Sequence, residues 1–168
     1  MTTPTARLDP TDNRTFRRVL GTLPTGVVAV TANAVDSGPV GMVIGSFTSI
    51  SIDPPLVAFS PSKTSTSWPK INGSRHFAVS VLSENQHAVC AAIASKSPDK
   101  LRQVAPRDGD RSNAPLVEDA LAWIECEVGA IHEAGDHWIV VARVLEFDIG
   151  PADKPLIFFK GEYSQIST

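Results

Sequence analysis

The sequence has few of the residues that build reactive clusters or covalent frameworks. It holds only two cysteines, Cys90 and Cys126, which are too few for a disulfide framework or a cysteine-based metal site. Its four histidines lie in different segments, so no zinc site is predicted. The common motifs of nucleotide-phosphate loops, serine hydrolases and zinc proteases are absent as well. A cofactor that brings its own reactivity is therefore a better hypothesis than catalysis by the protein's own nucleophiles.

The sequence also lacks a strong charge of either sign and a long apolar run. Its 15 basic and 18 acidic residues give a net charge of −3 at pH 7, which does not favour nucleic acid or an anionic membrane as a partner. No run reaches the length of a membrane-spanning helix, and residues 1–7 do not resemble a secretory signal. Both cysteines lie in apolar patterns and are expected to be free and buried. We therefore expect a cytoplasmic protein.

The length of 168 residues, with 42% hydrophobic residues, predicts one domain spanning residues 1–168, with a loose leader over residues 1–10. A short helix is expected from Asp12 to Gly21 and another from Trp68 to Ile71. A third is expected after Ser83, because Ser83 and Gln86 form a capping-box pattern. Strand patterns cover residues 26–31, 40–52, 56–60, 76–82, 123–131, 137–147 and 156–159, and an exposed loop is expected over 105–114.

These strands are joined mostly by short turns and show no alternation with helices, which favours a closed antiparallel barrel. Residues 137–147 are apolar on both faces, so we expect this strand to be covered on both sides, as in a barrel wall against a homodimer partner. Gly41 and Gly45 interrupt the expected strand 40–52. Glycine inside a strand marks a bend or the close approach of another group. A bound planar ring and a simple barrel bend are both open interpretations.

The segment from Ser60 to Ser67 is the strongest candidate binding loop. Six of its eight residues are serine or threonine, and the other two are Pro61 and Lys63. Short hydroxyls, backbone N–H groups and one ammonium are suited to a phosphate ester. A solvated linker is the alternative, but an apolar strand enters the segment and Trp68 follows it, which favours a binding loop.

Several motifs, in their order and spacing, resemble the short-chain NAD(P)H:flavin oxidoreductases, the reductase partners of two-component flavin-dependent monooxygenases. The motifs are Pro-Thr-Gly-Val at 24–27, Pro-Val-Gly-Met at 39–42, Gly-Ser-Phe-Thr-Ser-Ile-Ser at 45–51, Asp-Pro-Pro-Leu-Val at 53–57, Ser-Thr-Ser-Trp at 65–68, Gly-Asp-His at 135–137 and Pro-Leu-Ile-Phe-Phe at 155–159. The resemblance implies a mainly β fold, an antiparallel split β-barrel of the Greek-key, FMN-binding type with a few short flanking helices, assembled as a homodimer.

The resemblance also implies a function. FMN or FAD would accept hydride at N5 from NADH or NADPH, and the reduced flavin would pass to an oxygenase component. Two alternatives are open: a flavoprotein with tightly bound FMN that acts on its own small substrate, and a flavin-binding module without turnover.

The site residues that the resemblance implies fall into four groups. The flavin phosphate would face Ser60, Pro61, Lys63, Thr64, Ser65 and Ser67. The ring would lie against Val43, Ile44, Gly45 and Ser46, with Thr25 and Gly26 as a second contact and Tyr163 as a stacking candidate. His137 would position the nicotinamide and is the catalytic candidate.

His137 and Tyr163 each have an alternative interpretation. His137 is also explained as a solvent-facing residue beside a turn, and Tyr163 as an anchor of the last strand. Relatives often carry a polar residue at position 43, so Val43 leaves only a backbone hydrogen bond at that point. The resemblance also places Lys100 and Arg102 within reach of an adenylate or dinucleotide phosphate. The alternative is that both side chains are solvent-exposed, which is more common for such residues.

Overall fold

The computed structural model describes residues 7–95, 97, 100–101, 104–105 and 107–166. The helices in this part of the chain are α1 (Asn13–Leu20), α2 (Trp68–Ser74) and α3 (His87–Ala94). The strands are β1 (Thr25–Gly26), β2 (Val28–Ala34), β3 (Gly38–Ile44), β4 (Thr48–Ser51), β5 (Leu56–Phe59), β6 (His76–Val81), β7 (Arg107–Asp108), β8 (Pro115–Leu116), β9 (Ala122–Ala134), β10 (His137–Ile149), β11 (Ile157–Phe159) and β12 (Glu162–Ser164). In the described part of the chain, no helix combines the length and the apolar character needed to cross a membrane.

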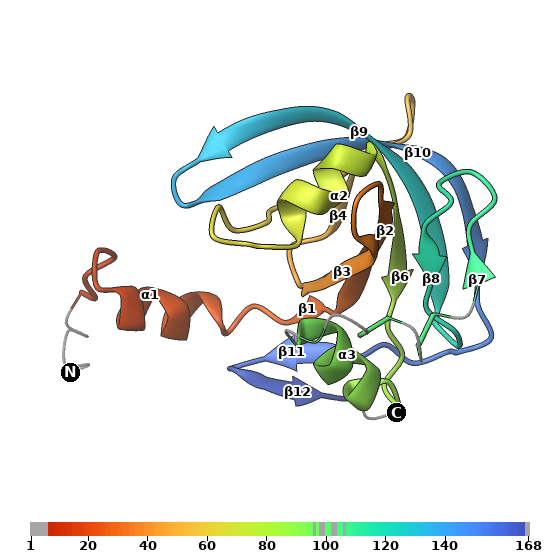
Figure 1. The fold of residues 1–168 in the computed structure, drawn as a ribbon. Coiled ribbons are helices and arrows are strands. Elements are labelled where there is room, and N and C mark those ends of the chain that lie inside the picture. Colours follow the sequence, from red (N-terminus) through yellow and green to blue (C-terminus); the bar gives the residue numbers. More distant parts are fainter. Residues whose placement is uncertain (1–6, 96, 98–99, 102–103, 106, 167–168) are drawn as a thin grey trace.

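Seven strands form one antiparallel sheet in the order β3-β2-β6-β9-β10-β5-β4. The long β9–β10 hairpin curves over the rest of the molecule, while β1, β11 and β12 form a small separate sheet below it (Figure 1). The mainly β, antiparallel prediction is therefore confirmed. The closed barrel is not: among the described residues β3 and β4 are the two edges of the sheet and do not pair.

The break between β3 and β4 also corrects the prediction of one strand over 40–52. A Cβ atom on Gly45 would lie 2.6 Å from Thr25 Oγ1, so the chain passes close to β1 at this point. A Cβ atom on Gly41 would meet the side chains of Leu101 and Thr31 at 3.3 Å. Protein atoms thus occupy the positions where Cβ atoms would lie at both glycines, so on that side the close approach is made by the protein itself.

The core beneath the candidate loop is aromatic. Phe59 at the end of β5 packs edge-on against Trp68 and against Phe77, with ring centroids 5.5 Å apart in both pairs. All three rings are buried, as is Ile71 on α2. Apolar burial of this kind fixes α2 on the sheet and holds both ends of the 60–67 loop in place.

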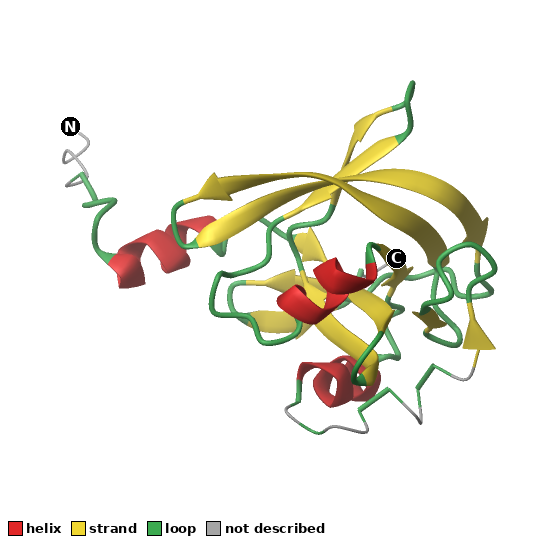
Figure 2. Ribbon diagram, turned by 45° about the horizontal axis from the view of Figure 1, so that its top comes forward, coloured by secondary structure: helices red, strands yellow, loops and turns green. Residues whose placement is uncertain are grey.

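Helix α1 begins where the sequence predicts, because the Asp12 side chain accepts hydrogen bonds from the N–H groups of Arg14 and Thr15. None of its residues is buried, and it projects away from the sheets (Figure 2). The expectation that 137–147 is covered on both faces is not met within one chain, since Phe147 is 72% exposed and Ile139 41%.

Helix α3 begins after Gln86 rather than after Ser83, although the Gln86 Oε1 atom accepts a hydrogen bond from the Ser83 N–H as the capping pattern predicts. A further strand, β12, follows the predicted last strand through a turn at Lys160 and Gly161, both with positive φ. Arg102 lies outside the described residues.

The expected exposed loop over 105–114 is partly folded and partly buried. β7 pairs with β8, and Ser112 and Ala114 are buried. Glu125 on β9 is only 6% exposed and holds this turn. Its carboxylate accepts hydrogen bonds from Arg111 N at 2.9 Å and from Ser112 N and Oγ at 2.5 and 2.7 Å. Burial raises the pKa of Glu125, but these hydrogen bonds outweigh it and lower the pKa overall.

We expect Glu125→Gln to lower the free energy of unfolding at pH 7 by about 1–3 kcal/mol, because the amide accepts these hydrogen bonds less well than a carboxylate does. A lowered folded-state pKa stabilises the fold above the unfolded-state pKa of about 4.3, and this contribution is lost as the pH falls through the folded-state value. Urea unfolding at pH 7 and pH 3 measures the difference. Exposed Glu162, changed to Gln, is the control. An equal loss at both pH values would contradict the role of the ionised carboxylate.

Candidate active site

The first part of the candidate site is a cavity of about 400 Å³ where β3 and β5 end. The Ser60 N–H donates a hydrogen bond to Ser46 Oγ at 2.9 Å, which ties the two strand ends together. The residues that line this cavity are Met42, Val43, Ile44, Gly45, Ser46, Ser60, Pro61, Ser62, Ser65 and His137. Its wall thus combines apolar side chains of β3 with serine hydroxyl and backbone groups. This combination suits a flat heteroaromatic ring with a polar edge.

His137 reaches this cavity because the start of β10 is hydrogen-bonded to the candidate loop. The Lys63 N–H donates to the Asp136 carbonyl, and the Trp138 N–H donates to the Pro61 carbonyl, each at 2.9 Å. The His137 Nδ1 atom lies 2.8 Å from Asp136 Oδ1, and this hydrogen bond lowers the pKa of Asp136. Because the imidazole of His137 is hydrogen-bonded through Nδ1, its Nε2 atom can form a hydrogen bond with another group.

The second part of the site is a larger cavity of about 780 Å³ on the other side of the loop. Its polar lining consists of Ser37, Thr64, Ser65, Thr66, Ser67, Lys70, Ser95, Ser97 and Lys100. It shares Met42, Val43 and Ser65 with the first cavity. The two cavities therefore adjoin each other along β3, and together they are here called the β3 groove.

Two of the loop's serines make hydrogen bonds that hold the loop in place. Ser67 Oγ donates to the Gly41 carbonyl at 3.0 Å, and Ser65 Oγ accepts from the Trp68 N–H at 3.1 Å. In the part of the chain that the structure describes, no acceptor is found for the backbone N–H groups of Thr66 and Ser67. These N–H groups, with the Thr66 hydroxyl, fit a phosphate that lies in the groove.

Three predicted cofactor contacts lie beside the groove rather than in its lining. Thr25 and Gly26 belong to β1, and Thr25 Oγ1 lies against Gly45 at the ring end. Lys63 forms an ion pair with Glu133 at 3.2 Å and lies over the Trp138 ring, 5.0 Å from its centroid. The ammonium predicted to bind phosphate is therefore already paired.

Tyr163 is separated from the groove within this chain. It lines a different cavity, of about 530 Å³, together with Glu84 and His87. Its Oη atom lies 3.0 Å from Cys90 Sγ, and this hydrogen bond, with burial, raises the pKa of Tyr163 to about 12. Burial also raises the pKa of Cys90, and that of Cys126 to about 12. Both thiols are free and buried, as predicted, and neither is set up to react as a thiolate.

The lining residues that sequence reasoning missed include Met42, Ser62, Thr66 and Lys70. Met42 and Thr66 lie inside the motifs that carry the family resemblance, and Ser62 lies in the hydroxyl loop. Lys70 had a weaker signal, since it lies in the first turn of the predicted helix after the loop. Only the placement of α2 beside β3 brings Lys70 to the groove.

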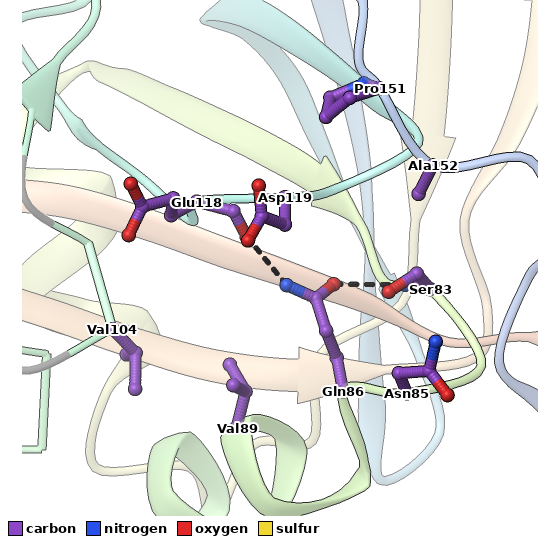
Figure 3. A pocket seen from close by; sticks show the side chains of 9 residues that line it. All are labelled: Ser83, Asn85, Gln86, Val89, Val104, Glu118, Asp119, Pro151 and Ala152. Carbon is purple, nitrogen blue, oxygen red and sulfur yellow. Dashed lines mark hydrogen bonds between the residues drawn. The ribbon is translucent and has the colours of Figure 1, made fainter.

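A further cavity of about 520 Å³ lies between the start of α3 and the segment that joins β8 to β9 (Figure 3). None of the predicted site residues lines it. Gln86 reaches across it, donates to the Glu118 carbonyl at 2.5 Å and accepts from Ser83 (Figure 3). Both ends of this amide are used in structural hydrogen bonds, so the cavity does not offer Gln86 to a ligand.

Comparison with known proteins identifies the family. The model of the flavin reductase like domain matches residues 20–167. A flavin reductase of Pseudomonas putida is 47% identical over 152 residues, which cover 90% of this chain and 89% of the relative. The chain belongs to the flavin reductase family.

Other relatives of this flavin reductase support the same conclusion. The reductase subunit HsaB of a flavin-dependent monooxygenase from Mycobacterium tuberculosis is 42% identical over 163 residues, covering 96% of this chain and 84% of the relative. The NADH:FAD oxidoreductase SgcE6 of Streptomyces globisporus, solved in complex with NAD and FAD fragments, superimposes with a TM-score of 0.90 at 34% identity, covering 97% of this chain and 98% of that one. The prediction of an NAD(P)H-dependent flavin reductase is confirmed at the level of the family.

Proposed function

We propose that this flavin reductase binds FMN or FAD in the β3 groove and NADH or NADPH next to it, and passes the reduced flavin to an oxygenase component. One observation carries the proposal: an apolar ring-sized cavity and a hydroxyl-lined cavity lie next to each other along one strand and share three lining residues. The similarity to the Mycobacterium tuberculosis relative, a monooxygenase reductase subunit, supports the transfer to an oxygenase.

When bound, the flavin supplies the redox chemistry as the hydride acceptor. The protein's part is positioning. Val43 and Ile44 provide an apolar wall for the ring, and the backbone at Gly45 and Ser46 provides hydrogen-bonding groups for its polar edge. The loop's N–H groups and hydroxyls hold the phosphate. His137, whose orientation is fixed by Asp136, lies at the ring end and orients the nicotinamide, which hydride transfer requires more than a proton donor.

The function is tested by following NADH and NADPH oxidation by the purified protein under anaerobic conditions, with FMN, FAD or no flavin. We expect turnover that depends on added flavin. In the same assay, His137→Ala should raise the KM for the nucleotide about 10-fold with a smaller change in the KM for flavin, because it removes a positioning contact. Flavin binding without nucleotide oxidation would indicate a binding module, and a bound flavin that survives gel filtration with little free-flavin reduction would indicate a flavoprotein with its own substrate.

We propose that the protein acts as a homodimer of single-domain split barrels. The apolar side chains of α1 support this proposal, since Phe16 and Leu20 are each at least 50% exposed on a helix too short to be stable alone. The exposed side chains of Ile139 and Phe147 on β10 support it as well. Sedimentation that gave only monomer at micromolar concentration would contradict it. The free cysteines fit the expected cytoplasmic location.

A further inference from the structure

The start of β10, which carries His137, is paired with the hydroxyl loop as one strand is with another. Ser62 and His137 form an antiparallel bridge, and the backbone N–H groups of Lys63 and Trp138 donate hydrogen bonds across it, each at 2.9 Å. The end of the β9–β10 hairpin lies next to this loop (Figure 1). The position of His137 therefore depends on how the loop is held against the hairpin.

Three side chains join the loop and the hairpin on the face of β10 opposite to His137. Trp138 follows His137 in the strand, and successive side chains of a strand point to opposite faces. Trp138 lies directly across the β9–β10 ladder from Glu133. The Lys63 ammonium group contacts both, at 3.2 Å from Glu133 Oε1 and 5.0 Å from the centroid of the Trp138 ring. These three side chains are here called the Lys63 clamp.

The clamp uses Lys63 in a different way from the residues beside it in the loop. Ser62 and Thr64 line the β3 groove, whereas Lys63 lines neither of its two cavities. The ion pair alone is weak, because the Lys63 side chain is 34% exposed and that of Glu133 72%. The Trp138 ring adds a second partner for the ammonium group, and it packs against the hydrophobic core. The ammonium group is thus held against a fixed surface.

We propose that Lys63 is a positioning residue, which acts through the hairpin by holding His137 at a fixed distance from the loop. This inference rests on the proposed function, because it takes the loop as the site of the flavin phosphate and His137 as the residue that orients the nicotinamide. Hydride transfer is sensitive to small displacements of the reacting groups. Loosening the clamp therefore slows hydride transfer and leaves the loop's own contacts with the flavin in place.

The test compares three variants of the clamp. Lys63→Met keeps the apolar part of the side chain and removes the ammonium group, Lys63→Arg retains a cation for both partners, and Glu133→Gln removes only the carboxylate charge. Anaerobic stopped-flow mixing of the flavin-loaded protein with NADH and with NADPH gives the rate of hydride transfer, and fluorescence quenching gives the Kd of FMN. Glu146→Gln is the matched control, since it breaks an exposed ion pair, with Arg111 at 3.4 Å, outside the groove.

We expect Lys63→Met to lower the rate of hydride transfer about 10-fold and Glu133→Gln about 3-fold, with the Kd of FMN changed less than about 2-fold. Lys63→Arg should restore most of the rate. A higher Kd of FMN in Lys63→Met, with an unchanged Kd in Glu133→Gln, would show that the ammonium group binds the phosphate and would overturn the inference. Rates in Lys63→Met and Glu133→Gln equal to that of Glu146→Gln would overturn it as well.

Hydrogen–deuterium exchange of the flavin-free protein tests the clamp without turnover. The backbone amides at positions 63 and 138 join the loop to the hairpin. We expect them to exchange about 3-fold faster in Lys63→Met and Glu133→Gln but not in Glu146→Gln, because a looser clamp allows more frequent local opening. Faster exchange would support the clamp even if no flavin were reduced, in which case only the proposed function would fail. Unchanged exchange would contradict the clamp whether or not the protein reduces flavin.

Discussion

Ser65→Asp is expected to weaken flavin binding about 100-fold, or by about 2.7 kcal/mol. Ser65 lines both parts of the β3 groove, so a carboxylate there would face the flavin phosphate. Two like charges 4 Å apart repel by about 4 kcal/mol at an effective dielectric constant of 20, and partial screening reduces this value. Fluorescence quenching titrations with FMN and FAD measure the change in Kd.

The substitution is chosen so that the fold is retained. Ser65 Oγ accepts a hydrogen bond from the Trp68 N–H, and aspartate supplies an acceptor at the same place. Ser49→Asp adds the same charge on exposed β4, outside the groove, and is the matched control. A Ser65→Asp protein that melts at the wild-type temperature and binds flavin with the wild-type Kd would place the flavin outside the β3 groove.

Phe59→Ala is expected to lower the free energy of unfolding by about 3–5 kcal/mol. The ring is 1% exposed and contacts two other aromatic rings at centroid distances of 5.5 Å. Its removal leaves a cavity beneath the strand that leads into the hydroxyl loop. Because a domain of this kind is stable by only about 5–15 kcal/mol, the loss is a large fraction of the total. Urea unfolding followed by circular dichroism measures it.

Phe147→Ala is the matched control, since it removes the same atoms from a ring that is 72% exposed. A change within about 0.5 kcal/mol is expected there if the chain is monomeric under the conditions used. If Phe59→Ala does not yield folded protein, Phe59→Leu gives a smaller loss of the same origin. Similar losses for Phe59→Ala and Phe147→Ala would show that the aromatic cluster does not anchor the fold.

Much of the fold could be predicted because its signals are local. Asp12 caps a helix and strand residues alternate over 123–131, and these patterns depend only on neighbours in the chain. The closed barrel and the uninterrupted strand over 40–52 were wrong for the opposite reason. Whether a strand continues through Gly45 depends on Thr25, which is distant in sequence but lies against it in the fold.

The same distinction applies to the candidate site. The motifs indicated the ring end and the hydroxyl loop, and the structure brings Val43 to Ser46, Ser60, Ser65 and His137 to one cavity. They did not indicate that Lys63 is paired with Glu133, or that Tyr163 lies against Cys90. Partners of long charged or polar side chains are set by contacts between distant segments, and no local pattern encodes them.

Thus the order of residues alone was sufficient for the family and the cofactor class, because short motifs and their spacing encode these. The three-dimensional packing was needed to show which cations face the groove. Lys70 and Lys100 are thirty residues apart, and only the docking of α2 and α3 on either side of β3 brings their charges to one cavity.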